Sequence, residues 1–223
     1  MKKTIAVIGL GRFGINLVQE LSKLDVEVIA IDSSKEKVLE ASDIVRHAFI
    51  CDATNSGNLK DVGVKDADHV IIAFGQNDEK TIIATVQTTI MVKKLGVKKI
   101  TVRLDTEEYA ETLLEIGATN IIYPSKIASE RCATRFAMDS ISDYFNVTGS
   151  FHVFEVVVPE TFVEVNLMDI NTPKNYNLNI LMIKRDGKTI IPNSQTVLSA
   201  NDSLFMFGEK VSVEKFSQFI TQQ

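Results

Sequence analysis

Short apolar segments alternate with amphipathic segments along the first 124 positions of the chain. The apolar segments are four to six residues long and rich in isoleucine and valine, which predicts six strands: Thr4–Ile8, Val26–Ile31, His47–Ile50, His69–Ala73, Lys99–Arg103 and Asn120–Tyr123. Apolar residues at helical spacing predict five helices between them: Arg12–Leu24, Lys35–Ser42, Ser56–Val62, Asp78–Leu95 and Glu107–Ile116. Such a pattern is typical of a parallel sheet with helices on both faces. We therefore predict a doubly wound α/β sheet.

The pattern changes beyond residue 124. A helical stretch is expected at Lys126–Phe145, and it carries more apolar surface than the sheet needs. The expected later elements are strands at Phe151–Pro159, Asn179–Arg185, Lys188–Pro192 and Ser203–Phe207 and a helix at Val213–Thr221. The dipeptide Asp186-Gly187 predicts a hairpin turn between two of these strands. We therefore divide the chain into residues 1–124, a connecting region at 125–149, and a small α+β domain at 150–223.

The turn after the first expected strand reads Gly9-Leu10-Gly11-Arg12-Phe13-Gly14. This G-x-G-x-x-G spacing between a strand and a helix is typical of Rossmann-like dinucleotide-binding sheets, whose strands have the order 3-2-1-4-5-6. Gly9 allows the tight turn, Gly11 lets a phosphate approach the backbone, and Gly14 lets helix and strand pack closely. The helix N-terminus offers unpaired N–H groups to the phosphate. The alternative is an ordinary βα turn without a ligand.

Other expected site residues follow from the position of the strand ends, because ligands of such sheets lie at the carboxyl edge. Asp32 ends the second strand, 18 residues beyond Gly14, where an acid accepts hydrogen bonds from ribose hydroxyls. Arg103 ends the fifth strand and is a phosphate candidate beside Arg12. The predicted nucleotide-binding residues are Gly9, Gly11, Arg12, Phe13, Gly14, Asp32, Ser33, Asp52, Ala53, Thr54, Ala73, Phe74, Gly75 and Arg103.

Three of these residues also have a purely structural interpretation. Asp32 and Asp52 each precede an expected helix, where an aspartate serves as an N-cap. In a nucleotide site, Asp52 would instead accept the exocyclic amine of an adenine. Arg12 is either a clamp for two phosphate oxygens or a solvated arginine at the start of a helix. The sequence alone does not separate these interpretations.

Composition narrows the class of protein. Of the 223 residues, 45% are hydrophobic and 24% are charged, as in ordinary globular domains. A net charge of -5 without a Lys/Arg cluster argues against a nucleic-acid or membrane-surface binder. No apolar run reaches the roughly 18–20 residues that span a bilayer, and no signal peptide is expected. The two cysteines, Cys51 and Cys132, fit a reduced cytosolic setting.

The sequence shows no group that would catalyse a reaction on a bound nucleotide. His47, His69 and His152 are scattered without ligand spacing, which favours structural roles. Ser125 and Ser129 have no histidine or aspartate neighbour that would activate a nucleophile. A dehydrogenase needs a proton donor beside the nicotinamide, and nothing after residue 149 resembles a catalytic constellation. We expect neither catalysis nor a metal site.

Several segments taken together resemble one family of proteins. These segments are Ile5–Gly14, Ala30–Asp32, His69–Gly75, Leu114–Ala118 and Ile122–Pro124. In this combination the chain resembles, over nearly its whole length, the cytosolic RCK subunits of bacterial Ktr and Trk potassium transporters. The resemblance implies a nucleotide-binding N-domain, a crossover helix region and a small RCK_C domain.

The resemblance also implies a function and an assembly. N-domains pair, and the homodimers assemble into an octameric ring beneath a membrane potassium channel-like subunit, which places the protein in the cytoplasm at the inner face of the membrane. ATP and ADP favour different ring shapes that gate ion flow, whereas Trk relatives bind NAD or NADH. By position, Arg12 would contact phosphate, Asp32 the ribose and Asp52 the adenine side. The protein would then be a non-enzymatic regulatory subunit.

Two positions depart from the family pattern. Ktr-type members commonly carry a glutamate after the proline that follows the sixth strand, where it helps to hold a cation near the phosphates. Here that residue is Ser125, so we predict no metal ligand at this position. Many RCK_C domains bind cyclic di-AMP through a D-I-R-x-K-Y-like segment. Here Asp169–Tyr176 lacks the arginine and has a longer spacing, so the motif for cyclic di-AMP is only partial.

Three functions are therefore alternatives. The first is a nucleotide-sensing regulator of potassium uptake. The second is a small NAD(P)-dependent oxidoreductase, which would need a histidine or lysine facing the cofactor. The third is an interaction module whose glycine turn binds no ligand.

Overall fold

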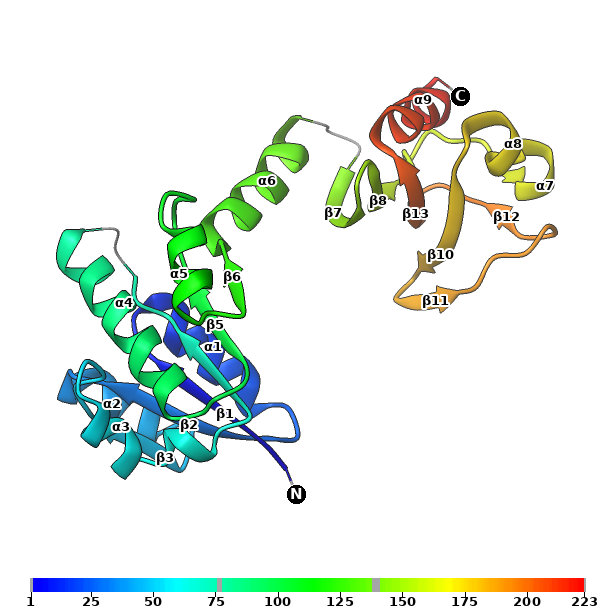
Figure 1. Cartoon of the computed structure of the whole chain (residues 1–223). Coiled ribbons are helices and arrows are strands. Elements are labelled where there is room, and N and C mark those ends of the chain that lie inside the picture. The colour runs from blue at the N-terminus through cyan, green and yellow to red at the C-terminus, as the bar shows by residue number, and fades with distance from the viewer. Residues whose placement is uncertain (1, 76–77, 138–140, 223) are drawn as a thin grey trace. The chain divides into compact units, whose positions relative to one another are not determined.

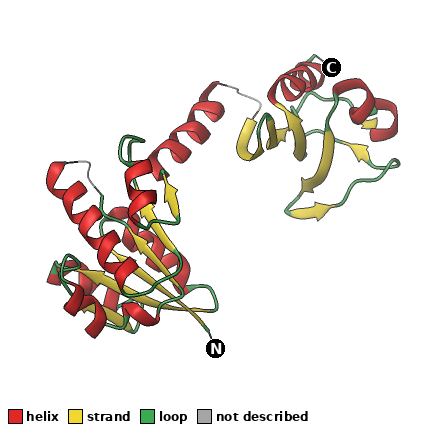
Figure 2. Ribbon diagram, in the orientation of Figure 1, coloured by secondary structure: helices red, strands yellow, loops and turns green. Residues whose placement is uncertain are grey.

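The computed structural model describes residues 2–75, 78–137 and 141–222 (Figure 1). The chain folds into two compact units, Met1–Lys126 and Ile127–Gln223. Each unit combines a β-sheet with helices (Figure 2). Among the helices that the structure describes, none has both the length and the apolar composition needed to cross a membrane.

The N-terminal unit is built on a parallel sheet with the strand order β3-β2-β1-β4-β5-β6. This order confirms the predicted doubly wound sheet. Ile8, at the end of β1, lies between Ile31 of β2 and Ile72 of β4, so the carboxyl ends of three strands meet beside the glycine turn. The strands are β1 (Lys3–Ile8), β2 (Val26–Asp32), β3 (His47–Ile50), β4 (His69–Ile72), β5 (Ile100–Arg103) and β6 (Asn120–Ile122).

Helices cover both faces of this sheet. They are α1 (Arg12–Ser22), α2 (Lys35–Ser42), α3 (Ser56–Asp61), α4 (Glu79–Lys94) and α5 (Ala110–Ile116), with a 3-10 turn at Val64–Asp66. Along β1, Ile5 and Val7 pack with α1 and α2, whereas Ala6 and Ile8 point into the cluster that includes α3, α4 and α5. Because both faces are buried, the central strands are apolar throughout.

The ends of these helices lie close to the predicted ones. Helix α2 and strand β3 begin and end at the predicted residues, and the other helices differ by one to three residues at an end. Gly96 and Gly117 follow α4 and α5 with φ of +88° and +131°, a backbone region that favours glycine.

The C-terminal unit contains an antiparallel sheet with the order β11-β10-β13-β8-β7. Its strands are β7 (Ile141–Thr148), β8 (Phe151–Val157), β10 (Asn179–Arg185), β11 (Lys188–Ile190) and β13 (Ser203–Glu209), with a separate pair β9 (Val165–Asn166) and β12 (Val197–Leu198). Its helices are α7 (Leu167–Ile170), α8 (Thr172–Tyr176) and α9 (Lys210–Thr221). The predicted hairpin is confirmed, because Asp186 and Gly187 have φ of 50° and 74°, as a two-residue type I′ turn requires.

The helix predicted at Lys126–Phe145 is wrong in its second half. Helix α6 covers Pro124–Ala137, and Ile141–Thr148 is strand β7. Met138 and the next two residues of the predicted helix lie outside the described residues. Aromatic and β-branched side chains are frequent in β7, which favours a strand once a partner strand is available. That partner is β8, which begins at Phe151, directly after the turn at Gly149 and Ser150, and pairs with β7 in an antiparallel hairpin.

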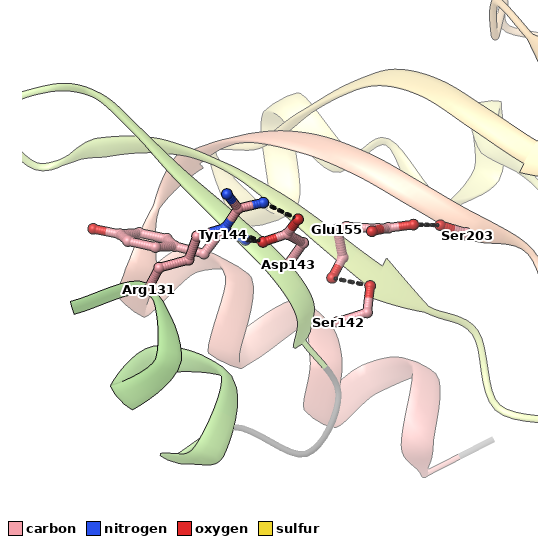
Figure 3. Close-up of polar contacts among 6 residues, drawn as sticks. All are labelled: Arg131, Ser142, Asp143, Tyr144, Glu155 and Ser203. Atoms are coloured by element: carbon pink, nitrogen blue, oxygen red, sulfur yellow. Dashed lines mark hydrogen bonds and ion pairs between the residues drawn. The ribbon is translucent and has the colours of Figure 1, made fainter. Parts of the chain in front are cut away.

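Polar side chains also hold β7 in place (Figure 3). Arg131 of α6 points toward Asp143 of β7 and donates to its carboxylate from Nε at 2.6 Å and from Nη2. This hydrogen bond lowers the pKa of Asp143. On β8, the Glu155 carbonyl accepts a hydrogen bond from Ser142 Oγ at 3.3 Å, and its carboxylate accepts one from Ser203 Oγ at 2.6 Å.

Candidate functional site

A cavity of about 790 Å³ opens at the carboxyl edge of the parallel sheet. Its position agrees with the general location of ligands in doubly wound sheets. Eight of the predicted site residues line it: Gly9, Gly11, Arg12, Asp32, Ala73, Phe74, Gly75 and Arg103. The glycine turn, the end of β2, the end of β4 and the end of β5 are thus brought together around one space.

The three glycines of the turn have three different environments. Gly9 has a φ of +96°, and a Cβ there would lie 2.8 Å from the Phe74 ring. A Cβ on Gly14 would lie 1.9 Å from the carbonyl oxygen of Gly9, so helix α1 packs directly against the turn. A Cβ on Gly11 would meet nothing within 4 Å. Gly9 and Gly14 therefore serve the packing of the turn, whereas the space beside Gly11 is open to a ligand.

Two helices, α1 and α4, begin at this cavity, and their N-termini differ. Gly11 is the N-cap of α1, makes no side-chain cap, and is followed by no acidic residue in the first turn. Asp78 is the N-cap of α4, and its carboxylate accepts a hydrogen bond from the Thr81 N–H at 2.8 Å. The first N–H groups of α1 and the positive end of its dipole are therefore the better seat for a phosphate.

Asp32 has a structural role in the turn. Its side chain is buried, Oδ2 accepts a hydrogen bond from the Leu10 N–H at 2.7 Å, and Oδ1 accepts one from the Ser34 N–H at 2.8 Å. The N-cap of α2 is Ser34, so the interpretation of Asp32 as that cap is wrong. Lys37 Nζ lies 3.4 Å from Oδ2. The carboxylate thus ties the end of β2 to the glycine turn and still lines the cavity.

Positive charge prevails around the cavity. Four cationic side chains line it, those of Arg12, Lys37, Lys80 and Arg103, against the two carboxylates of Asp32 and Asp78. A cavity with this charge balance favours an anionic ligand.

Five lining residues were missed by the sequence reasoning: Lys37, Asp78, Lys80, Thr81 and Ala84. They come from α2 and from the start of α4. A helix that follows a strand of a parallel sheet begins at the carboxyl edge, so residues in its first turn were a usable signal.

Arg103 is fixed inside the cavity wall. Its side chain is 12% exposed, and Nη2 donates to Asp105 Oδ1 and Oδ2 at 3.1 and 3.3 Å. Its guanidinium carbon lies 5.4 Å from the centroid of the Phe13 ring, which places Phe13 beneath the guanidinium rather than on the cavity surface. Stacking of this kind orients an arginine.

A second hollow, of about 470 Å³, contains Ser33 and Asp52 of the predicted site together with Cys51. Asp52 Oδ1 accepts hydrogen bonds from the Thr54 hydroxyl at 2.7 Å and the Thr54 N–H at 3.0 Å, and these bonds lower the pKa of Asp52. Burial raises the pKa of the Cys51 thiol. The N-cap of α3 is Asn55, so the interpretation of Asp52 as that cap is wrong.

The remaining predicted residues lie away from the two hollows. Ala53 is buried, and its carbonyl accepts a hydrogen bond from Thr88 Oγ1 at 3.3 Å. Thr54 supports Asp52, and Gly14 lies in the packing between helix and turn. Their contribution to a site is therefore indirect.

The histidines occupy structural positions away from the cavity. His69 Nε2 lies 2.8 Å from Thr101 Oγ1, and burial, together with Lys3 and Lys99, lowers the pKa of His69. His47 Nε2 lies 3.1 Å from Glu27. Within residues 2–75, 78–137 and 141–222, no three or more histidine, cysteine, aspartate or glutamate side chains are grouped so as to hold a metal ion.

Comparison with known proteins gives two family matches. A family model of the TrkA-N domain matches residues 5–124, and one of the TrkA-C domain matches residues 152–221. Ktr system potassium uptake protein C of Bacillus subtilis (strain 168) is 35% identical over 219 residues, which are 98% of this chain and 97% of that protein. Ktr system potassium uptake protein A of the same organism is 30% identical over 215 residues, 96% of this chain and 95% of that protein.

A solved structure of the GsuK channel bound to NAD aligns with a TM-score of 0.50 and 21% identity, covering 100% of this chain and 39% of that one. At this identity the likeness shows a shared fold.

Proposed function

Because the chain belongs to the Ktr family of potassium uptake proteins, which join a TrkA-N to a TrkA-C domain, we propose that it is a regulatory subunit that senses an adenine nucleotide and gates potassium uptake. The observation that carries the nucleotide part is the cavity at the carboxyl edge of the sheet. There, the uncapped N-terminus of α1 and the open space at Gly11 lie among four cationic side chains. Such a surface suits the phosphates of a nucleotide.

Each part of the ligand has residues suited to it. The N–H groups after Gly11 and the exposed Arg12 receive the phosphates. The Asp32 carboxylate has lone pairs beyond those used by the backbone and accepts ribose hydroxyls. Ser33 and Asp52 in the second hollow receive the adenine side. ADP and ATP fit this division, and NAD or NADH is the alternative, because it shares the adenosine and the pyrophosphate.

Gating follows from differential binding. A nucleotide shifts the equilibrium between two shapes of the subunit only by as much as its affinities for the two shapes differ. In this proposal residues 1–124 bind the nucleotide, 125–149 connect, and 150–223 complete the subunit. Homodimers form an octameric ring in the cytoplasm beneath a membrane potassium channel-like subunit. The subunit performs no reaction on the nucleotide.

A second ligand is proposed for the C-terminal unit. A hollow of about 340 Å³ is lined by Asn171, Thr172 and Pro173, within the segment that matches a cyclic di-AMP motif in part. Titration with cyclic di-AMP tests this proposal. The described residues that line this hollow include no arginine, so salt should affect this binding less than nucleotide binding at the N-terminal cavity.

Calorimetric titration of the purified chain with ATP, ADP, NAD and NADH tests the main proposal. We expect binding of at least one of them, and loss of that binding in Gly11→Asp, which places a carboxylate in the open phosphate seat. Absence of binding by all four contradicts the proposal. Turnover of the nicotinamide with an added substrate would favour an oxidoreductase instead. Potassium uptake by cells that express the membrane subunit with and without this chain tests the gating part.

A further inference from the structure

Among the described residues, the hydrogen bonds of the Arg103 guanidinium are made by Nη2. Nη2 donates to both oxygens of Asp105, at 3.1 and 3.3 Å. Nε is buried and has no hydrogen-bond partner among the described residues. Nη1 lies beside Gly75, where an added Cβ would come within 3.3 Å of it. Because Gly75 lines the cavity, the side of the guanidinium that Asp105 does not use lies at the cavity wall.

The side-on fork of an arginine is formed by Nε and Nη2, and in Arg103 Nη2 donates to Asp105 while Nε is buried. Nη1, beside Gly75, is therefore the donor that a phosphate in the cavity can reach. A hydrogen bond from a guanidinium to a phosphate oxygen is charge-assisted and strong. The ring of Phe13 beneath the guanidinium and the carboxylate of Asp105 behind it limit the positions that the guanidinium can adopt.

The strand order places Arg103 on the other side of the glycine turn from Asp32. Asp32 ends β2, Gly9 follows β1, and Arg103 ends β5, in the spatial order β2-β1-β4-β5. The Arg103 side chain extends back toward the turn, since its guanidinium carbon lies 5.4 Å from the centroid of the Phe13 ring. With the ribose at Asp32, Arg103 is therefore placed to contact the phosphates that the glycine turn receives. A nucleoside without phosphates does not reach it.

Asp105 also contacts helix α6, which follows α5 and β6 along the chain. Ser125 Oγ donates to Asp105 Oδ1 at 3.1 Å, and Ser125 is in the first turn of α6. In the same loop after β5, Glu107 pairs with Lys126 at 2.7 Å. The carboxylate that orients Arg103 thus also holds the start of α6, the helix in which the chain passes from the N-terminal to the C-terminal unit.

We propose that Asp105 and Ser125 are positioning residues that hold Arg103 ready for the terminal phosphate of a nucleoside di- or triphosphate, and that they couple the bound phosphate to the first turn of α6. This inference rests on the proposed nucleotide site and deepens it. Asp105 sets the direction of the guanidinium through Nη2. A phosphate on the open donors fixes the guanidinium further, which fixes Asp105 and, through Oδ1, the Ser125 hydroxyl.

Calorimetry with two probes, ADP and adenosine, tests the inference on the full chain. In Asp105→Asn we expect the affinity for ADP to fall about tenfold or more, since a charge-assisted hydrogen bond is lost. The affinity for adenosine should stay within about twofold, because adenosine does not reach Arg103. Arg103→Lys should behave in the same way, since it keeps the charge and loses the fork. Glu111→Gln, an exposed change on α5, is the matched control and should change neither affinity.

Hydrogen exchange tests the coupling to α6. We expect ADP to protect the amides of the first turns of α6 in the natural chain, and Ser125→Ala to lose this protection while still binding ADP. Melting temperatures show that each variant is folded. Equal affinities of Asp105→Asn and the natural chain for ADP contradict the inference, as does an equal loss for ADP and adenosine. If the natural chain binds neither probe, the proposed function itself fails and the inference fails with it.

Discussion

Two arginine–aspartate pairs, one in each unit, use their donors in opposite ways. In the C-terminal unit, Arg185 donates from Nε and Nη2 to the two oxygens of Asp202, at 2.6 and 2.7 Å, and Nη2 also reaches the Val197 carbonyl at 2.8 Å. The buried Asp202 accepts a further hydrogen bond from the Ser199 N–H at 2.9 Å. In the N-terminal unit, Arg103 uses Nη2 alone and leaves Nε buried without a partner among the described residues.

The difference separates a structural pair from a pair that awaits a ligand. The fork of Arg185 already matches a carboxylate, so this pair joins the end of β10 to the turn that precedes β13. Nη1 of Arg103 instead lies beside Gly75, at the wall of a cavity lined by further cations. Buried charges with open donors are therefore better guides to a binding site than buried charges alone.

The largest expected effect is on the closed pair. Asp202→Asn leaves the guanidinium of Arg185 without its carboxylate partner. The free energy of unfolding of the C-terminal unit should fall by about 2–3 kcal/mol, toward the low end for a broken buried pair because Arg185 is partly exposed. Hydrogen exchange of β10 and β13 amides measures this stability. ADP affinity should not change. Glu160→Gln, an exposed change in the same unit, is the control, and a loss as small as that of the control would show that the pair is not structural.

Two glycines of the turn also differ in role, because one serves packing and the other lies at the proposed phosphate site. Gly14→Ala places a methyl group 1.9 Å from the Gly9 carbonyl, and overpacking of this kind should destabilise the N-terminal unit by about 1–3 kcal/mol. The methyl group of Gly11→Ala would meet none of the described residues within 4 Å, so the free energy of unfolding should stay within about 0.5 kcal/mol of that of the natural chain. The affinity for ADP should fall about tenfold, because the methyl group enters the phosphate seat. Thermal melting and calorimetry check both changes. A Gly11→Ala variant that binds ADP normally would remove Gly11 from the site.

Asp32 is expected to contribute both to the stability of the glycine turn and to the binding of adenosine. Asp32→Ala removes the acceptor of two backbone N–H groups, so stability should fall by about 1–3 kcal/mol together with adenosine affinity. Calorimetry with adenosine, at a temperature where the variant remains folded, separates the two effects. Unchanged adenosine affinity in a folded variant would place Asp32 in the turn alone.

The smallest expected effect concerns pH. Burial lowers the pKa of His69, with Lys3 and Lys99 acting in the same direction. The unfolded chain therefore binds a proton more readily than the folded chain, so stability should fall as pH drops below the ordinary histidine pKa of about 6.5. Urea midpoints at several pH values between about 7 and 5 measure this loss. His69→Gln should flatten this dependence, and an unchanged slope would show that His69 does not contribute.

The contrast between the units also explains what the sequence could predict. In the N-terminal unit, strands buried on both faces give apolar runs that are easy to recognise, and the glycine spacing marks the turn. In the C-terminal unit, α7, α8, β9 and β12 are two to five residues long and were missed, because so few residues show no periodicity. The segment assigned to β7 was predicted as helix because its apolar positions were taken at helical spacing and the hairpin turn at Gly149 and Ser150, which pairs it with β8, was not used.

The residues of the candidate site also differ in how far the sequence predicts them. Residues at strand ends were predictable from the sheet order, and eight of them line the cavity. Lys37 and Lys80 were missed because the site was predicted from strand ends and the glycine turn, whereas these lysines reach the cavity from the first turns of α2 and α4. Asp105 and Ser125 were missed as well, since a contact across 20 positions of the chain depends on how the loop after β5 meets α6.

The most direct measurement of the central claim is the ratio of the dissociation constants of adenosine and ADP for the full chain, obtained by calorimetry in one buffer. If the uncapped N-terminus of α1 and the open donors of Arg103 bind phosphates, ADP should bind at least about tenfold more tightly than adenosine, and Gly11→Asp should abolish this advantage. Equal affinities of the two ligands, or an advantage that survives Gly11→Asp, would contradict the account.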